Sequence, residues 1–301
     1  MGTVFKITTN GVLTRLHAFS YTDDGSSPYG ALVQGREGHF YGTTYGGGTS
    51  TTGGGTVFKI TTNGVLTSLH SFTGFNDGGG PNGLVRGGDG DFYGTTSTGG
   101  DTNLNYGQGF GTLFKITTNG ALTTLHSFTG ANDGGTPVAG LVQGSDGNFY
   151  GTANQGGTYA SGFNSPGTVF KISTNGTLTT LYSFTGGNDG GNSVAGLVQG
   201  SDGSFYGTTL GGGAGHVGTV FPLTIVRAAP VFQAVTLTNS TLSLTWSTEA
   251  GGRYQVQYNS DLSSSNWINL SNAVIAAGAT LSVTDSVTNA PRRFYRAVLS
   301  P

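Results

Sequence analysis

Short runs of apolar and β-branched residues alternate with glycine-rich polar turns along most of the chain. One such unit reads GTLFKITTNGALTTLHSFTGANDGGTPVAGLVQGSDGNFYGT, from Gly111 to Thr152. Val, Ile, Thr, Phe and Tyr dominate the runs, and none of the runs has the spacing of an amphipathic helix. Asn-Gly and Asp-Gly pairs between apolar runs are a strong signal for tight β-hairpins. The pattern therefore predicts four short strands in each unit and an all-β fold.

The same unit recurs at a nearly constant interval. The string G-T-V/L-F begins at five positions with spacings of 53, 56, 56 and 51 residues: Gly2, Gly55, Gly111, Gly167 and Gly218. Units of this length that carry four strands match the blades of a β-propeller better than the shorter coils of a solenoid. We therefore expect a β-propeller of four four-stranded repeats over residues 1–227.

The number of strands does not fit this ring evenly. With the strands of a blade named A (GLVQG), B (NFYGT), C (GTVFKIT) and D (LTTLHSF), the sequence holds four A, four B, five C and four D strands. Sixteen strands close a four-bladed ring, in which Val12–Ser20 supplies the last D strand. Either Thr3–Thr8 or Thr219–Ile225 is then surplus, or the ring does not close within one chain.

Residues 228–301 have a different composition but also alternate as β-structure. The runs TLSLTWS, RYQVQYNS and RRFYRAVL predict a small β-sandwich of the fibronectin-III or immunoglobulin type. We expect Trp246, Tyr295 and either Tyr254 or Tyr258 to form its aromatic centre. The short domain ends directly after a strand, so an open sheet edge is expected there.

The repeat motif GTVFKIT…GTLTTLHSFTG…DG…AGLVQGSDGNFYGTT resembles the GloVer-type tandem repeats of bacterial secreted proteins, over residues 2–225. The tail, with YQVQYNSDLSSSNWINL and RRFYRAVLSP, resembles the fibronectin-III-like module that often ends such proteins. The resemblance implies an extracellular or cell-surface bacterial protein with a propeller-like fold, and it supplies no catalytic residues. The chain departs from longer members in having few repeats and in having no signal peptide before Gly2.

Composition excludes several classes of partner. Only 9% of the residues are charged, and the formal net charge is −2, so the sequence carries no basic patch for nucleic acid. No apolar run is long enough for a membrane span, and the chain holds no cysteine for disulfides or thiolate metal sites. The motifs H-E-x-x-H, G-x-S-x-G and the P-loop do not occur. We therefore expect a protein that is not an enzyme.

The loops of the two propeller faces differ in their variability. The A–B and C–D turns are tight and nearly identical between repeats, whereas the B–C connections vary in length and composition. Variable loops on one face often mark a binding side, and aromatic rings combined with amides suit a neutral glycan. The same loops could equally be simple spacers. The candidate ligand-binding residues are Tyr45, Asn103, Tyr106, Asn154, Tyr159 and Phe163.

Four aspartates recur in the loops between D and A strands: Asp24, Asp77, Asp133 and Asp189. Oxygen ligands beside glycine suit Ca²⁺, which is the one cofactor the sequence suggests. The alternative is a structural role, in which each carboxylate accepts backbone N–H groups of its own turn.

Two hypotheses for function follow. The first is an extracellular structural or adhesive protein that assembles with further copies of itself into fibres. In this hypothesis the N-terminal C–D hairpin exchanges between chains, through the strand formed by Thr3, Val4, Phe5, Lys6 and Ile7. The alternative is a carbohydrate-binding module that uses the variable-loop face to bind an extracellular glycan.

Overall fold

The computed structural model describes residues 1–159, 165–225, 229–249, 252–276, 278–288 and 292–300. In these ranges the chain forms strands β1 to β24 and one 3-10 turn at Asn105–Gly107. The prediction of an all-β chain is confirmed. Chain contacts divide the molecule into two compact units, which hold β1–β17 and β18–β24 respectively.

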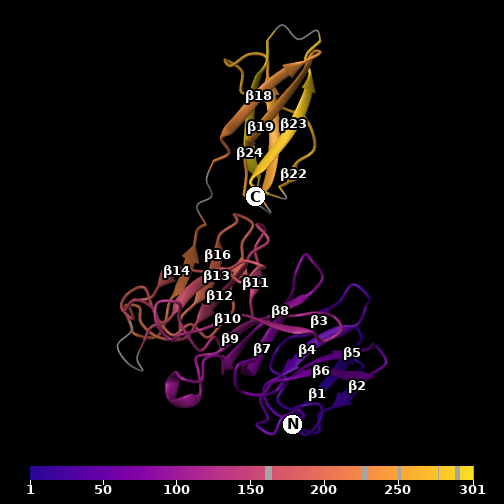
Figure 1. Cartoon of the computed structure of the whole chain (residues 1–301), viewed down its shortest axis with the longest axis vertical. Coiled ribbons are helices and arrows are strands. Elements are labelled where there is room, and N and C mark those ends of the chain that lie inside the picture. The colour runs from indigo at the N-terminus through magenta and orange to yellow at the C-terminus, as the bar shows by residue number, and fades with distance from the viewer. Residues whose placement is uncertain (160–164, 226–228, 250–251, 277, 289–291, 301) are drawn as a thin grey trace. The chain divides into compact units, whose positions relative to one another are not determined.

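Three complete four-stranded antiparallel sheets follow one another in the first unit (Figure 1). Sheet 1 consists of β3 (Val33–Gln34), β4 (Phe40–Thr44), β5 (Thr56–Ile60) and β6 (Leu66–Ser71). Sheet 2 consists of β7 (Gly79–Arg86), β8 (Phe92–Thr98), β9 (Thr112–Ile116) and β10 (Leu122–Ser127). Sheet 3 consists of β11 (Val142–Gln143), β12 (Phe149–Ala153), β13 (Thr168–Ile172) and β14 (Leu178–Ser183). The strands of each sheet pair in chain order, as the A-B-C-D pattern predicts.

Incomplete sheets lie at both ends of this series. The N-terminal hairpin is a two-stranded sheet of β1 (Thr3–Ile7) and β2 (Leu13–Ala18), equivalent to C and D strands. Sheet 4 has three strands, β15 (Val198–Gln199), β16 (Phe205–Thr208) and β17 (Val220–Leu223), equivalent to A, B and C. Both candidates for the surplus C strand are therefore paired, β1 with β2 and β17 with β16. No pairing joins the hairpin to sheet 4 among the described residues.

The turn chemistry explains why each C–D hairpin forms locally. Between β9 and β10, the backbone N–H of Ala121 donates to Oγ1 of Thr117 at 3.0 Å. Gly120 in the same turn has a φ of 93°, a left-handed conformation that glycine adopts without steric strain. A hydroxyl accepts the equivalent bond in the other three C–D turns, at 3.0 to 3.1 Å. The repeated Thr/Ser-x-Asn-Gly sequence therefore fixes the same hairpin four times.

The hydrophobic core of the first unit lies between consecutive sheets. One cluster joins Tyr41, Val57 and Phe72 of sheet 1 with Phe92 and Phe114 of sheet 2. A second cluster joins sheets 2 and 3, and a third joins the N-terminal hairpin to sheet 1. Successive sheets thus pack face to face around the array, in the manner of propeller blades.

The second unit contains two antiparallel sheets. Strands β18 (Phe232–Thr238), β19 (Thr241–Ser247) and β23 (Thr280–Ser286) form one of them. The other consists of β20 (Arg253–Asn259), β21 (Ile268–Asn269), β22 (Val274–Ile275) and β24 (Phe294–Ser300). Both sheets contribute to one buried cluster, which includes Trp246 and Tyr254 and against which Tyr295 packs. The predicted domain boundary at residues 227 and 228 lies outside the described residues, and the fibronectin-III-like identity of this unit stays a prediction.

Within the described part of the chain, none of the helical structure has the length and apolar character needed to cross a membrane.

Candidate functional site

A repeated aromatic contact joins consecutive sheets at their B strands. The ring of Tyr41 stacks on Phe92, with centroids 4.1 Å apart. Tyr93 stacks on Phe149 and Tyr150 on Phe205 at the same distance. All three tyrosines are 1% exposed, because each is covered by the following sheet. In the FYGT motif, the phenylalanine therefore provides the ring for the preceding junction and the tyrosine the ring for the following junction.

Two further contacts repeat at each junction. The phenylalanine that follows each D strand packs against the C-strand phenylalanine of the next sheet, with ring centroids 5.0 to 5.3 Å apart: Phe19–Phe58, Phe72–Phe114, Phe128–Phe170 and Phe184–Phe221. A B-strand threonine also donates to a backbone carbonyl of the next sheet, at 2.7 to 3.2 Å: Thr43 to Asn82, Thr95 to Ala139 and Thr152 to Ala195. These contacts form a modular interface that can be repeated wherever two complete sheets meet.

Sheet 4 exposes the surface that the other sheets bury. Tyr206 corresponds to Tyr41, Tyr93 and Tyr150, but 41% of it is exposed. Val220 of β17 is 77% exposed, whereas the equivalent residues of the other C strands are at most 5% exposed: Val4, Val57, Leu113 and Val169. Thr208, equivalent to the threonines that donate across the junctions, is also exposed. We call the surface formed by Val198, Tyr206, Thr208 and Val220 the tail surface.

The N-terminal hairpin exposes the opposite side of the same interface. Phe5 and Ile7 of β1 are 54% and 62% exposed. Their equivalents in the complete sheets are at most 1% exposed: Phe58, Phe114, Phe170, Ile60, Ile116 and Ile172. We call the surface formed by Phe5, Ile7 and the half-buried Phe40 the head surface.

The residues predicted for assembly therefore differ in their environment. Val4 is buried against sheet 1, in a cluster with Phe19, Phe58 and Ile60. Thr3, Phe5, Lys6 and Ile7 are exposed, and all five residues pair with β2. One face of the predicted strand, with Val4, therefore packs on sheet 1, and the other face, with Phe5 and Ile7, is exposed.

A cavity of about 390 Å³ lies where the segments before the four A strands converge. Four equivalent glycines from the four sheets line it: Gly30, Gly83, Gly140 and Gly196. A Cβ on Gly30 would lie 2.9 Å from the Cα of Gly83, so these backbones approach too closely for a side chain. Sheets 1 to 4 are therefore arranged around a common centre.

The four loop aspartates each bind groups of their own repeat. Asp133 accepts a hydrogen bond from the backbone N–H of Thr129 at 3.0 Å and lies 3.0 Å from Nε2 of His126. Asp24 and Asp77 repeat this arrangement with His17 and His70, and Asp189 does so with Tyr182. Burial acts to raise the pKa of Asp133, but the hydrogen bonds from His126 and Thr129 outweigh it and hold the pKa below its ordinary value.

This arrangement favours the turn-forming role over the calcium site. The oxygens of each carboxylate already accept two or more hydrogen bonds within the loop. In the described parts of the chain, no group of three or more His, Asp or Glu side chains is placed to hold a metal ion. The prediction of Ca²⁺ at Asp24, Asp77, Asp133 and Asp189 therefore gains no support from the geometry.

The predicted ligand-binding residues that the structure describes do not converge on one site. Tyr45 lies 5.7 Å from the ring of Tyr29, and Asn103 contacts Asp101 within its own loop. Asn154 spans a sheet junction, where its Nδ2 donates to the carbonyl of Ser193 at 3.4 Å. Phe163 lies outside the described residues.

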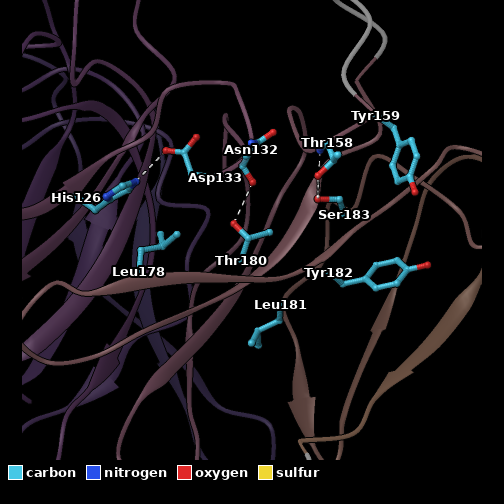
Figure 2. A pocket seen from close by; sticks show the side chains of 10 residues that line it. All are labelled: His126, Asn132, Asp133, Thr158, Tyr159, Leu178, Thr180, Leu181, Tyr182 and Ser183. Carbon is cyan, nitrogen blue, oxygen red and sulfur yellow. Dashed lines mark hydrogen bonds and ion pairs between the residues drawn. The ribbon is translucent and has the colours of Figure 1, made fainter.

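Two of the predicted tyrosines line separate pockets. Tyr106, which is 90% exposed, borders a pocket of about 330 Å³ with Phe110 and Gln155. Tyr159 borders an open pocket of about 670 Å³, together with Tyr182 and the pair formed by His126 and Asp133 (Figure 2). Tyr182 was not among the predicted residues. Its signal in the sequence is that it replaces the histidine of the other D strands, beside a loop that carries a second tyrosine.

Comparison with known families identifies the repeat region. Residues 1–221 match the Gloeobacter/Verrucomicrobia repeat. The chain belongs to this repeat family. The resemblance seen in the repeat motif is thus confirmed, while the family match does not extend to the second unit. No curated protein sequence matches the chain.

Solved structures with a similar fold include a gluconolactonase, XC5397 from Xanthomonas campestris. It is 13% identical with a TM-score of 0.44, and the match covers 80% of this chain and 75% of the other. A luciferin-regenerating enzyme is 11% identical with a TM-score of 0.43, and the match covers 79% of this chain and 74% of the other.

These comparisons correct the expectation that the protein is not an enzyme. That expectation was wrong in treating the missing motifs as decisive, because solved structures of similar fold belong to enzymes. At these identities and TM-scores, the likeness transfers no activity, substrate or catalytic residue to this chain.

Proposed function

We propose that this protein is an extracellular or cell-surface structural protein that assembles head to tail with further copies of itself. One observation carries the proposal. The interface that is buried between consecutive sheets is exposed at both ends of the array, as the tail surface on sheet 4 and the head surface on the N-terminal hairpin. Tyr206 of the tail surface and Phe40 of the head surface correspond to the two rings of one repeated contact, Tyr41 on Phe92.

Exchange of the N-terminal hairpin would complete a four-stranded blade between two copies. Strands β15 and β16 supply A and B, and β1 and β2 of a second copy supply C and D. In this arrangement β1 takes the place of β17 beside β16. The registers of the complete sheets set the pairing, since each B-strand tyrosine lies opposite a C-strand lysine: Tyr41–Lys59, Tyr93–Lys115 and Tyr150–Lys171. Tyr206 would accordingly lie opposite Lys6 of the second copy.

The exchanged blade would also bury Tyr206 and Thr208 in the contacts seen at the other junctions. Tyr206 would stack on Phe40 of the second copy, as Tyr41 stacks on Phe92. The hydroxyl of Thr208 would donate to the carbonyl of Tyr29 in the second copy, as Thr43 does to Asn82. Burial of exposed apolar side chains such as Tyr206 and Phe40 is the main driving force for association.

The ring of Phe5 would likewise reach a partner in the exchanged blade. Phe184 packs on Phe221 at a centroid distance of 5.0 Å, and exchange would bring Phe5 of the second copy to that place. Every aromatic ring of the two end surfaces would then have the neighbour that its equivalents have inside the array.

Strand β17 is the weakest of the C strands and is therefore the one that would be displaced. It has four residues, whereas the other C strands have five. Pro222 occupies the position of the repeated lysine opposite Tyr206, and proline has no N–H to donate to a neighbouring strand.

The contact is heterologous, because each copy would use one surface for one neighbour and the other surface for the next. Such contacts continue into fibres unless the rotation between copies closes a ring. A fibre with a Gly-, Thr- and Asn-rich surface of low charge suits a matrix or adhesive layer outside the cell. Its bacterial extracellular location is part of the proposal.

Sedimentation velocity on the full chain over a range of concentrations tests the assembly. We expect oligomers that grow with concentration. We expect Phe5→Asp to give monomers, because its carboxylate would be buried without a partner in the contact. We expect Tyr206→Lys to do the same, because its ammonium group would lie opposite Lys6 of the second copy. Both positions are exposed in the single chain, so the variants keep its fold.

Val65→Asp is the matched control, because Val65 is also exposed at 59% but lies in a hairpin turn away from both end surfaces. This variant should assemble like the unmodified chain. A chain that remains monomeric at all concentrations would overturn the proposal. So would assembly that persists in both the Phe5 and the Tyr206 variants.

A further inference from the structure

The open pocket in Figure 2 lies beside a pair of aromatic side chains that occurs at one place in the repeat array. Tyr182 replaces the histidine found at the equivalent positions of the other D strands: His17, His70 and His126. Tyr159 stands where the equivalent loops have Ser50, Thr102 and Gly215. Two independent departures from the repeat thus meet in one pocket of about 670 Å³, bordered by strands of sheets 2 and 3.

Both tyrosines present ring surface to solvent. Tyr159 is 58% exposed and Tyr182 is 42% exposed. The hydroxyl of Tyr182 donates to Asp189 at 2.9 Å, which fixes the ring position. Burial and then the hydrogen bond to Asp189 raise the pKa of Tyr182 above its ordinary value, so the ring stays uncharged at neutral pH. A fixed neutral ring is a suitable platform for the C–H face of a sugar.

Apart from Leu178 and Leu181, polar groups line the rest of the pocket. Asp133 is anchored by His126, and its lowered pKa keeps it ionised as a hydrogen-bond acceptor. The hydroxyl of Thr180 is held by the carbonyl of Asn132 at 3.0 Å. Thr158 donates its backbone N–H to Ser183 at 3.3 Å and so holds the loop that carries Tyr159. No lysine or arginine is among the residues that border the pocket in the described part of the chain.

From this combination we infer a binding site for a neutral oligosaccharide, with Tyr159 and Tyr182 as stacking platforms. Oδ1 of Asp133, which accepts one hydrogen bond, from Thr129, among the described residues, is the acceptor for a sugar hydroxyl group. A hydroxyl-rich ligand fits a pocket that offers donors and acceptors around two rings. An anionic glycan does not fit, because the carboxylate of Asp133 would repel it and no basic side chain balances that charge. Tyr182 also borders a second pocket of about 270 Å³, which includes Val220 of the tail surface.

The test is binding of the full chain to an array of neutral plant and bacterial polysaccharides, with uronic-acid and sialylated glycans on the same array. We expect binding to a subset of the neutral glycans. For a positive glycan, Tyr159→Ala should weaken binding by about tenfold, since a ring contact contributes on the order of this factor. Tyr182→His should weaken it similarly while keeping the fold, because three other repeats carry histidine hydrogen-bonded to aspartate at this place.

Tyr106→Ala is the matched control, since Tyr106 is an exposed loop tyrosine that borders a different pocket. It should bind like the unmodified chain. The inference fails if no neutral glycan binds above background or if anionic glycans bind more strongly. It also fails if binding is unchanged in both the Tyr159 and the Tyr182 variants. None of these outcomes depends on assembly, which the Phe5→Asp chain removes from the assay if assembly occurs.

Discussion

Tyr150 stacks on Phe205 with ring centroids 4.1 Å apart, while Tyr206, the next residue along the same strand as Phe205, is 41% exposed. One strand thus shows both sides of the interface that organises the molecule. On the side of β16 that faces sheet 3, Phe205 is covered by the ring of Tyr150. On the other side, Tyr206 is not covered by a following sheet. This asymmetry is the basis of the proposed assembly.

The buried and exposed members of the tyrosine series should respond differently to truncation. Tyr150→Ala removes a ring that is 1% exposed and leaves a cavity at the junction, so we expect a loss of about 3–5 kcal/mol in the free energy of unfolding. Tyr206→Ala should change the stability of the single chain by less than about 1 kcal/mol. Urea unfolding of both variants at low protein concentration, below any assembly, makes the comparison. Equal losses of unfolding free energy in Tyr150→Ala and Tyr206→Ala would show that Tyr206 is buried in the single chain and would contradict this account.

Stability should fall in acid through the loop aspartates. Asp24, Asp77, Asp133 and Asp189 have pKa values held below 3.8 in the folded chain. A carboxylate with a depressed pKa contributes stability above its unfolded value and loses that contribution as pH falls through the folded value. The free energy of unfolding should therefore decrease as pH is lowered from about 4.

The variant that checks this cause is Asp133→Asn, which should show a flatter pH dependence below pH 4 than the unmodified chain. Asp23→Asn serves as the control, since Asp23 is an exposed carboxylate beside Asp24. Urea midpoints measured at several pH values would give the slopes. A slope as steep in Asp133→Asn as in the unmodified chain would contradict the assignment.

Two glycines with the same backbone conformation should differ in their tolerance of a side chain. Gly167 has a φ of 94°, and a Cβ there would lie 2.2 Å from the carbonyl oxygen of Ala153. Gly147 has a φ of 81°, and a Cβ there meets nothing within 4 Å. Gly147→Ala should lower stability by about 1–2 kcal/mol from the left-handed conformation alone. Gly167→Ala should lower it by clearly more, because a backbone atom must move. Similar thermal midpoints for the two variants would argue against the close approach.

Trp246 should stabilise the second unit through the volume that it fills in the core, not through a hydrogen bond from its N–H group. It is fully buried, and its Nε1 has no hydrogen-bond partner among the described residues. Trp246→Phe should therefore be tolerated better than Trp246→Ala, which we expect to lower the free energy of unfolding by about 3–5 kcal/mol. Fluorescence separates the two tryptophans of the chain, since Trp246→Phe leaves only Trp267, which is partly exposed beneath Arg296. Equal stability of the two variants would contradict the packing role.

Much of the fold could be predicted because its determinants are local. The hairpin turn at Thr117 and Gly120 is specified by four consecutive residues, and the strands on either side follow from their β-branched and aromatic runs. The pairing at the ends could not be predicted in this way. Strands β1 and β17 have nearly the same sequence, and local preference does not decide which of them completes a blade with β16.

The candidate site was predicted only in part. Tyr159 was predicted as an aromatic residue in a variable loop, but Tyr182 was not among the candidate residues. The two line one pocket because a hydrogen bond from the backbone N–H of Thr158 to Ser183 holds the loop of Tyr159 beside β14. No local sequence pattern reports this contact. Asn154, an amide in a variable loop, spans a sheet junction through the carbonyl of Ser193, and its predicted role in ligand binding stays a prediction.

Strand exchange between copies is the central claim, and a mixed disulfide tests it most directly. The chain has no cysteine, so Lys6→Cys in one preparation and Tyr206→Cys in another introduce one thiol each. The repeat register places these positions opposite each other in the exchanged blade. After mixing under mild oxidation, we predict a disulfide-linked pair of one Lys6→Cys chain and one Tyr206→Cys chain, identified by mass, in excess over either self-linked pair. A double variant that instead forms the disulfide within a monomer, or a mixture with no preference for the mixed pair, would contradict exchange between copies.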